Sequence, residues 1–307
     1  MAIFLGIDGG ATKTSCVIGD ECSILGTGRA DGSNVIRVGE ELAKQALTVA
    51  IGDACTAARI DPTEITQTCI GVAGAARPQI HTVVQRILQQ LVGGEIEVAG
   101  DMVIALDAAF DGEPGVVVIA GTGSIAYGEN ATGETARAGG WGWAISDEGS
   151  GYWIGRTAVA GLMRSRDEEP AQQRSLLLEG VLQCWGLHSV DELVPAANAS
   201  PPRDFSRLFP VAVAASDAGD AVAREVLQRA GVELAQLASI VMGGLFSEAA
   251  NVQVGMSGGV FANSALVRQA FQGNLSSTCP VARVKTEIAD PVFGALARAR
   301  RIRGKHG

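Results

Sequence analysis

The feature that most constrains this chain is a run near its N-terminus in which two β-strands flank a glycine-rich turn. Apolar residues from Ile3 lead to Asp8 and a pair of glycines, and residues 16–18 (Cys-Val-Ile) are strand-like again. Glycine has no Cβ atom, so the backbone can turn tightly and present its N–H groups to a ligand. Those N–H groups, with the two hydroxyls and one ammonium of residues 12–14 (Thr-Lys-Thr), suit a polyphosphate. The run predicts a β-hairpin whose turn contacts phosphate, and a hairpin that binds no ligand is the alternative.

The same run differs from a P-loop. Ala11 stands where that motif requires its second glycine, and Lys13 comes one position late. The residues that follow favour a strand, whereas a P-loop opens a helix. The sequence therefore predicts a strand–turn–strand unit.

A second run, residues 116–128, repeats this arrangement. An apolar strand meets a Gly-Thr-Gly-Ser turn at 121–124 and continues into another strand-like segment. The spacing of Gly121, Gly123 and Ala126 nominally fits the dinucleotide-binding fingerprint, but that fingerprint must open a helix. We therefore expect a duplicated strand–turn–strand architecture in place of a Rossmann fold.

Composition and charge restrict the class of function. The chain has 307 residues, of which 47% are hydrophobic and 19% charged, and this length is enough for two compact domains. A net charge of −9 argues against a nucleic-acid partner. Binding of an anion would need a local positive charge, for which Lys13 and Mg²⁺ are the candidates.

Cysteine, histidine and hydropathy patterns exclude further classes. The six cysteines form no C-x-x-C pair and the three histidines are far apart, so no zinc or iron–sulfur spacing is present. No basic leader precedes the first strand, and no apolar run approaches membrane-spanning length. We expect a cytoplasmic protein with no membrane partner.

The remaining periodicity predicts an α/β chain. In the first third of the sequence, strands are expected at 23–29, 67–73 and 95–99 and helices at 40–59, 80–92 and 102–110. This order, βββαβαβα, indicates an antiparallel opening followed by crossover connections. A third glycine-rich turn, residues 257–260, follows a strand at 252–256, and Asp290-Pro291 is expected to begin a final helix.

Several polar residues next to predicted helices have alternative roles. Asp101 follows a strand and precedes a helix, where it can act as a general base beside a crevice or cap the helix. Asp107 is a rival base, but its mid-helix position favours solvent or the crevice rim. Asp147, Glu148 and Ser150 precede a long helix, so they can cap it or contact a ligand.

These turns and carboxylates together resemble the actin/Hsp70/sugar-kinase superfamily. Within it, the chain resembles the BadF/BadG/BcrA/BcrD ATPase family, and specifically its N-acetylglucosamine kinases. The likeness covers nearly the whole chain and is carried by residues 6–14, 121–124, 139–153 and 257–260. The run that contains Gly-Gly-Trp-Gly and Asp-Glu-Gly-Ser, within 139–153, is its most distinctive part.

The resemblance implies a fold and a domain division. The fold is α/β, a two-domain actin-like ATPase (ribonuclease H-like) architecture with duplicated mixed sheets and a central nucleotide and sugar cleft. The N-terminal domain would comprise 1–113 with the returning helix 291–307, and the C-terminal nucleotide-binding domain 114–290.

The resemblance also implies site residues. It matches Asp101 to the catalytic base, and Asp8 is suited to hold Mg²⁺ through water. Sugar contacts are implied at Asn34, Ser124 and Asp147. ATP contacts are implied at Gly9, Gly10, Thr12, Lys13, Thr14, Gly121, Thr122, Gly123, Gly258 and Gly259. Ile36 and Ile125 depart from the tryptophan and asparagine of animal members, which leaves the amino sugar's substituent open.

The implied function is an ATP-dependent kinase acting on the 6-hydroxyl of an amino sugar, N-acetylglucosamine, with ATP and Mg²⁺ as cofactors. Glucosamine kinase and a non-catalytic sugar sensor that binds ATP remain alternatives, and a homodimer is left open. Dehydratase activators of the same fold carry cluster-binding cysteines that this chain lacks in the corresponding loops. Sugar-responsive ROK repressors add an N-terminal helix-turn-helix, and the short segment before the first strand leads us to expect none here.

Overall fold

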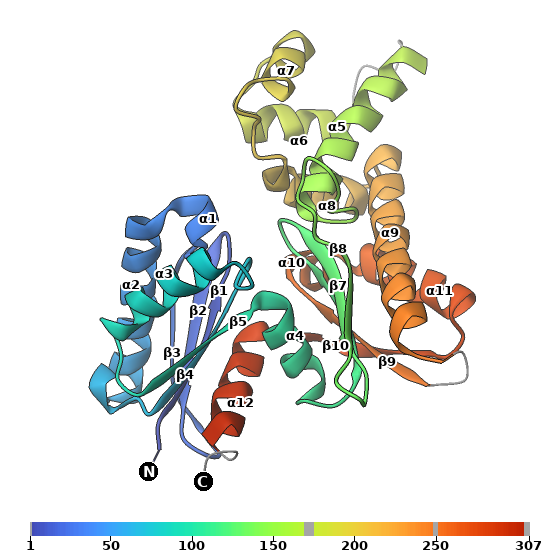
Figure 1. Cartoon of the computed structure of the whole chain (residues 1–307). Helices are drawn as coiled ribbons and strands as arrows, with labels where there is room; N and C mark the ends of the chain where they lie inside the picture. The colour runs from blue at the N-terminus through green and yellow to red at the C-terminus, as the bar shows by residue number, and fades with distance from the viewer. Residues whose placement is uncertain (1, 169–174, 248–250, 304–307) are drawn as a thin grey trace. The chain divides into compact units, whose positions relative to one another are not determined.

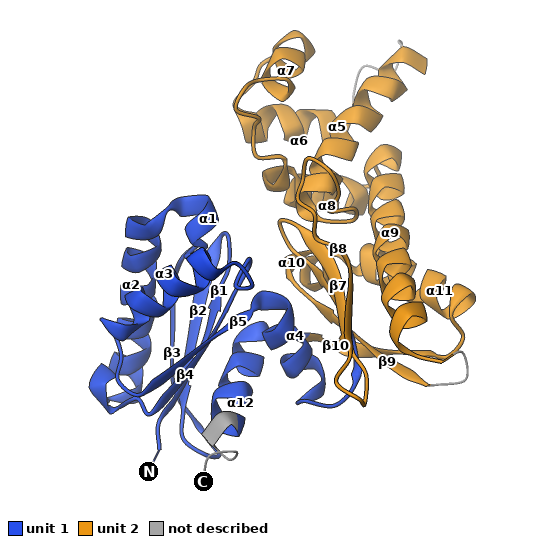
Figure 2. Ribbon diagram, in the orientation of Figure 1, with its two compact units in different colours: residues 1–117, 289–307 blue, residues 118–288 orange. Residues whose placement is uncertain are grey.

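The computed structural model describes residues 2–168, 175–247 and 251–303 (Figure 1). The chain divides into two compact units (Figure 2). Unit 1 comprises residues 1–117 and 289–307, and unit 2 comprises residues 118–288. The divisions therefore fall after Val117 and after Ile288, a few residues from the boundaries that the resemblance implied.

Unit 1 contains a five-stranded mixed sheet in the order β3-β2-β1-β4-β5. Its strands are β1 (Phe4–Gly9), β2 (Lys13–Gly19), β3 (Ile24–Asp31), β4 (Gln67–Val72) and β5 (Glu95–Gly100). The pairs β1/β2 and β2/β3 are antiparallel, whereas β1/β4 and β4/β5 are parallel. The predicted antiparallel opening and the later crossovers are confirmed.

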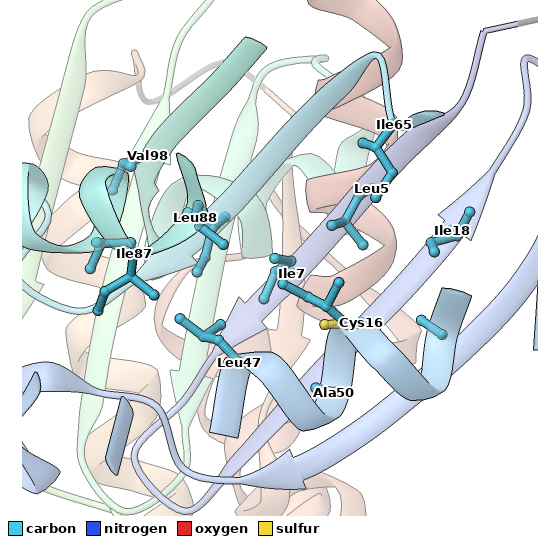
Figure 3. Packing of buried hydrophobic residues seen from close by; sticks show 14 of the residues in the cluster. Leu5, Ile7, Cys16, Ile18, Leu47, Ala50, Ile65, Ile87, Leu88 and Val98 are labelled. Atoms are coloured by element: carbon cyan, nitrogen blue, oxygen red, sulfur yellow. The ribbon is translucent and has the colours of Figure 1, made fainter. Parts of the chain in front are cut away.

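Helices cover both faces of this sheet. They are α1 (Val35–Val38), α2 (Glu40–Ala58), α3 (Pro78–Gln89), α4 (Asp101–Phe110) and α12 (Pro291–Arg303), with a short 3₁₀ turn, η1 (Pro62–Glu64). One core lies under α2 and α3, where Leu5, Ile7 and Ile18 of the sheet meet Leu47 and Leu88 (Figure 3). A second core on the opposite face joins β1 and β4 to α4 and α12. The last helix of the chain thus packs in unit 1.

Unit 2 repeats the sheet of unit 1, since its strand order is β10-β9-β6-β7-β8. Its strands are β6 (Gly115–Ala120), β7 (Ser124–Glu129), β8 (Thr135–Gly139), β9 (Val252–Ser257) and β10 (Ala282–Ala289). When the sheet of unit 2 is read from β8 to β10, its strands follow in the order third, second, first, fourth, fifth. The strands of unit 1 have the same order from β3 to β5. The predicted duplication is confirmed.

The sequence did not predict β8 and β10. Both lie at edges of the sheet, and β8 has the composition Thr-Ala-Arg-Ala-Gly, which has weak intrinsic strand preference. Its strand conformation comes from antiparallel pairing with β7, in a register that runs from Ile125↔Gly139 to Glu129↔Thr135.

The helices of unit 2 include the long helix α9, against which α5, α8 and α11 pack. They are α5 (Gly151–Glu168), α6 (Leu176–Trp185), α7 (Val190–Ala197), α8 (Phe209–Asp217), α9 (Ala221–Leu245), α10 (Gly259–Asn263) and α11 (Ala265–Thr278), with a 3₁₀ turn, η2 (Phe205–Leu208). α9 packs against α11, β7 and β8. The apolar pattern of the sequence predicts a helix over residues 172–186; residues 172–174 lie outside the described residues, and α6 confirms the rest. Among the described helices, none has the length and apolar character needed to span a membrane.

Candidate active site

The first glycine-rich turn joins β1 to β2. Thr12 and Lys13 are exposed there, as a phosphate-binding role requires. Gly9 has a packing role as well, because a Cβ at this position would lie 2.8 Å from Cγ1 of Val72 and 3.1 Å from Oγ of Ser33. The glycine pattern at this turn therefore reflects close packing in addition to any ligand.

The Thr14 side chain supports the neighbouring loop. It is fully buried, and its Oγ1 lies 2.7 Å from the carbonyl oxygen of Asp31 and 2.8 Å from Oγ of Ser33. The strand alternation that exposes Lys13 turns Thr14 into the protein. The Thr14 hydroxyl, which the sequence suggested as a phosphate ligand, therefore binds residues 31 and 33 instead.

The same loop brings Asn34 beside the first turn. The backbone N–H groups of Ser33 and Asn34 donate to the carbonyl of Gly10, at 3.2 and 3.3 Å. Oδ1 of Asn34 accepts the N–H of Ile36 at 3.0 Å and so begins α1. The amide nitrogen of Asn34 makes no hydrogen bond to another described residue, so it remains able to donate to a hydroxyl. Ile36 is exposed next to it.

Two carboxylates lie where strands of unit 1 end. Asp8 is near the end of β1, and Asp101 follows β5 directly as the first residue of α4. Because β1, β4 and β5 are parallel, their carboxyl ends meet at one edge of the sheet. Burial raises the pKa of Asp101 above its ordinary value, although the carboxylate accepts the N–H of Met102 at 3.0 Å. The side chain of Asp101 therefore contacts the helix start and has the raised basicity that suits a general base.

Asp8 is electrostatically coupled to its neighbours. Its pKa is raised to about 7, first by burial and then by the charges of Asp101 and Asp290, although the Lys13 ammonium lowers it. A half-buried carboxylate that ionises with difficulty beside another acid suits a bound cation, because the cation would restore its charged form. Among the described residues, no group of three or more histidine, cysteine or acidic side chains is arranged to hold a metal. A Mg²⁺ ion at Asp8 would need water and phosphate oxygens as its other ligands.

Asp107 is not a candidate base. The expectation that it faces solvent or a crevice rim was wrong, since only 7% of the residue is exposed. Its carboxylate binds Arg298 at 3.2 Å and also binds Arg301, both from α12. These arginines lie about 190 positions away in sequence, so no local pattern could reveal them.

In unit 2, the second glycine-rich turn lies against Asp147. A Cβ on Gly123 would be 2.9 Å from Oδ2 of Asp147, so glycine here leaves room for that carboxylate. Asp147 is buried and has a left-handed backbone with φ of 66°. Burial raises its pKa, while N–H groups of Gly142 and Ser124 donate to the carboxylate and lower it. These two donors fix one face of the carboxylate.

The structure separates the roles of residues 147–150. The helix cap is Ser150, whose Oγ accepts the N–H of Trp153 at 3.1 Å, and Asp147 does not cap α5. The buried hydroxyl of Ser124 donates to the carbonyl of Glu148 at 2.7 Å. Ser124 therefore links the second turn to the Asp147 segment, and only its lone pairs remain for a ligand.

The remaining glycines differ in their surroundings. A Cβ on Gly121 would meet no atom within 4 Å, so packing does not require glycine there and a ligand could approach the backbone. Gly258 has φ of 96°, and a Cβ would lie 2.4 Å from the carbonyl oxygen of Ala120. It lets β9 turn into α10, where Gly259 is exposed. Of the glycines of this unit that the resemblance assigns to ATP, Gly121 and Gly259 leave room for a ligand to approach the backbone.

Sequence reasoning did not predict that Asp290 would raise the pKa of Asp8. Asp290 was assigned only to the start of the last helix, where its Oδ1 does accept the N–H of Val292 at 3.4 Å. Its influence on Asp8 comes from the return of α12 to unit 1, for which the Asp-Pro pair gives no signal.

Comparisons with known proteins agree with this architecture. Residues 5–298 match the BadF/BadG/BcrA/BcrD ATPase family. The chain is 31% identical to an N-acetylmuramic acid/N-acetylglucosamine kinase of Clostridium acetobutylicum, over 98% of this chain and 99% of that protein. It is 29% identical to an N-acetyl-D-glucosamine kinase of Dictyostelium discoideum, over 97% of each chain.

A solved structure from Chromobacterium violaceum has the same fold. It superposes with a TM-score of 0.74 at 23% identity and covers 96% of this chain and 98% of its own. The chain therefore belongs to the BadF/BadG/BcrA/BcrD ATPase family.

Proposed function

We propose that the protein is an ATP-dependent kinase that phosphorylates the 6-hydroxyl of an amino sugar, with N-acetylglucosamine as the preferred substrate. The observation that carries the proposal is the position of Asp8 and Asp101 at the carboxyl ends of parallel strands in unit 1. It occurs in a chain that matches N-acetylglucosamine kinases over nearly its whole length. Phosphoryl transfer depends mainly on positioning and charge stabilisation, which such a pair can supply.

The proposed roles follow from the geometry of each unit. Ionised Asp101 accepts the proton of the sugar 6-hydroxyl while that oxygen bonds to the γ-phosphorus. The bond from the γ-phosphorus to the bridging oxygen breaks, and ADP leaves. Mg²⁺, when bound, neutralises charge on the phosphate oxygens, and Asp8 is the residue suited to hold it.

The other proposed contacts involve the three glycine-rich turns. Thr12 and Lys13 of the first turn and the open backbone at Gly121 and Gly259 are assigned to ATP. The remaining residues of the three turns act by giving these segments their shape. Asn34 and Asp147 are assigned to sugar hydroxyls, one as a donor and the other as an acceptor.

Glucosamine is the second candidate substrate. Ile36 and Ile125 are apolar where the resemblance locates contacts to the amino sugar's substituent, and neither offers a side-chain partner to an amide. An N-acetyl group would gain apolar contact there but no hydrogen bond from these two side chains.

A panel of sugars tests the proposal. The purified protein with ATP and Mg²⁺ is assayed for ADP formation with N-acetylglucosamine, N-acetylmuramic acid, glucosamine and glucose, and ³¹P NMR identifies the ester. We expect the highest kcat/KM for N-acetylglucosamine and a 6-phosphate product. A higher value for glucosamine would contradict the N-acetyl assignment only. Sugar binding without turnover for any member would indicate a sensor and contradict the kinase.

Asp147→Asn is expected to lower kcat/KM by about 10–150-fold, because a charged hydrogen bond to a sugar hydroxyl contributes about 1.5–3 kcal/mol. Asparagine tolerates the left-handed backbone and can still accept the N–H of Gly142 or Ser124. Steady-state kinetics with each active sugar measure the loss.

Ser150→Ala is the matched control for this substitution. It removes the helix cap and should lower stability by about 1 kcal/mol, with kinetics close to those of the parent. A variant of Asp147 that retains parental kcat/KM would exclude a sugar contact at this residue.

A further inference from the structure

The proposed base, Asp101, lies at the corner where β5 ends and α4 begins. β5 ends at Gly100 and α4 starts at Asp101, so the angle between strand and helix determines where the carboxylate points. The N–H of Met102 that binds this carboxylate belongs to the same helix and cannot fix the helix relative to the strand. The position of Asp101 therefore depends on contacts that hold α4 against β5.

One side chain bridges the two arms of this corner. Nε of Arg298 lies 2.9 and 3.0 Å from the two carboxylate oxygens of Glu97, in β5. Nη1 of the same guanidinium lies 3.2 Å from Oδ2 of Asp107, in α4. A guanidinium is planar and its donors have a fixed arrangement, so it holds two carboxylates at a defined separation.

Two glycines allow α12 to deliver this arginine. A Cβ on Gly294 would lie 1.9 Å from the carbonyl oxygen of Ile104 in α4. A Cβ on Gly6 of β1 would lie 2.4 Å from the backbone nitrogen of Leu296. The backbone of α12 thus contacts both α4 and β1, the elements that carry Asp101 and Asp8 (Figure 1). Because these contacts are between backbones, α12 has little freedom to shift against α4 and β1. The position of Arg298 relative to both elements is therefore fixed.

We propose that Arg298 is a positioning residue, which sets the angle between β5 and α4 and thereby holds Asp101 where it accepts the proton. This inference rests on the proposed function of Asp101. The simpler alternative is that Arg298 only stabilises the unit. Comparison with Arg301 distinguishes the positioning role from the stabilising role. Arg301 also binds Asp107, but its second partner is Asp111, at 2.8 Å, just after the end of α4. Arg301 contacts the helix side of the corner, whereas Arg298 connects helix to strand.

The test compares Arg298→Lys with Arg301→Lys in the full chain. Lysine keeps the charge in each case, but one ammonium cannot reproduce the forked contact with both Glu97 and Asp107. We expect Arg298→Lys to lower kcat by about 10–100-fold, since a displacement near 1 Å can cost this much. KM for ATP and for sugar should change by no more than about 3-fold. Arg301→Lys should keep kcat within about 2-fold, and Glu97→Gln should reproduce the Arg298 effect.

A second measurement does not require turnover. The amide of Met102 donates to Asp101, so its ¹H–¹⁵N chemical shift reports the geometry of the corner. It should move in Arg298→Lys and Glu97→Gln but not in Arg301→Lys, with all three variants folded by circular dichroism. If the parent phosphorylates no sugar, the proposed function fails, and the amide shift alone decides whether Arg298 sets the corner.

Two results would overturn the positioning role. One is equal loss of kcat in the two lysine variants, which would indicate a general effect on the unit. The other is parental turnover in Arg298→Lys or, in a protein without measurable turnover, a Met102 amide that does not move.

Discussion

Asp101→Asn is expected to reduce kcat by about 10²-fold or more, because the variant keeps the shape of the side chain but cannot accept the substrate's proton. The amide oxygen can still accept the N–H of Met102, which the carboxylate binds at 3.0 Å, so the start of α4 should persist. ATP affinity, measured by calorimetry, and the circular dichroism spectrum should be close to those of the parent.

The pH dependence gives a further check on the same residue. Since burial raises the pKa of Asp101, the parent should lose kcat on the acid side at a pH above the ordinary range of aspartate. This acid limb should be absent from the residual activity of Asp101→Asn.

Asp61→Asn provides the matched control. Asp61 also accepts a backbone N–H near a helix start, that of Thr63, at an exposed position, so the same chemical change is made away from the site. It should leave turnover unaltered. If Asp101→Asn retains turnover within a few-fold of the parent, Asp101 has no part in proton transfer.

Asp8→Asn is expected to have opposite effects on activity and stability. Loss of a carboxylate suited to hold Mg²⁺ should reduce kcat/KM on the order of 10²-fold and weaken Mg²⁺ dependence. In the ligand-free protein the same substitution should raise Tm at pH 8. The reason is that the folded protein ionises Asp8 unfavourably, as its pKa of about 7 shows, chiefly because of burial and then Asp101.

The sign and the pH window follow from the difference between folded and unfolded states. The unfolded chain releases the Asp8 proton near the ordinary value of 3.8 and the folded chain near 7, so parental stability falls as pH rises through this interval. The Tm difference between variant and parent should be close to zero below pH 4 and reach its full size above pH 7. Three pKa units correspond to at most about 4 kcal/mol.

Differential scanning fluorimetry across this pH range, with and without ATP and Mg²⁺, measures the effect. The variant's advantage should shrink when the parent binds Mg²⁺ and ATP, since the cation removes the penalty that the substitution relieves. If the ligand-free variant had a lower Tm than the parent at every pH, Asp8 would not be a carboxylate whose ionisation destabilises the folded protein.

Features that depend on local pattern could be predicted from the amino-acid sequence alone. Glycine pairs between strand-like runs predicted both hairpins, and the order of elements predicted the antiparallel opening with crossovers, because strand periodicity and turn chemistry are readable over a few residues. The position of Asp101 between a strand and a helix was also evident. The edge strand β8 was not, since its conformation comes from pairing with β7 and not from intrinsic preference. The edge strand β10 was not predicted either, although its alternating Val, Thr and Ile are typical of a strand.

The tertiary structure decided how individual side chains are used. Asp107 was a plausible base until α12 supplied Arg298 and Arg301 as its partners. From the sequence, Asp147 and Ser150 were equivalent as helix caps. In the structure Asp147 binds the N–H groups of residues 124 and 142, whereas Ser150 binds the N–H of Trp153 and caps the helix. Each of these assignments depends on groups that packing brings together. A hydrogen bond or ion pair requires a partner within about 3 Å, and the separation of two residues along the chain does not show whether they lie that close.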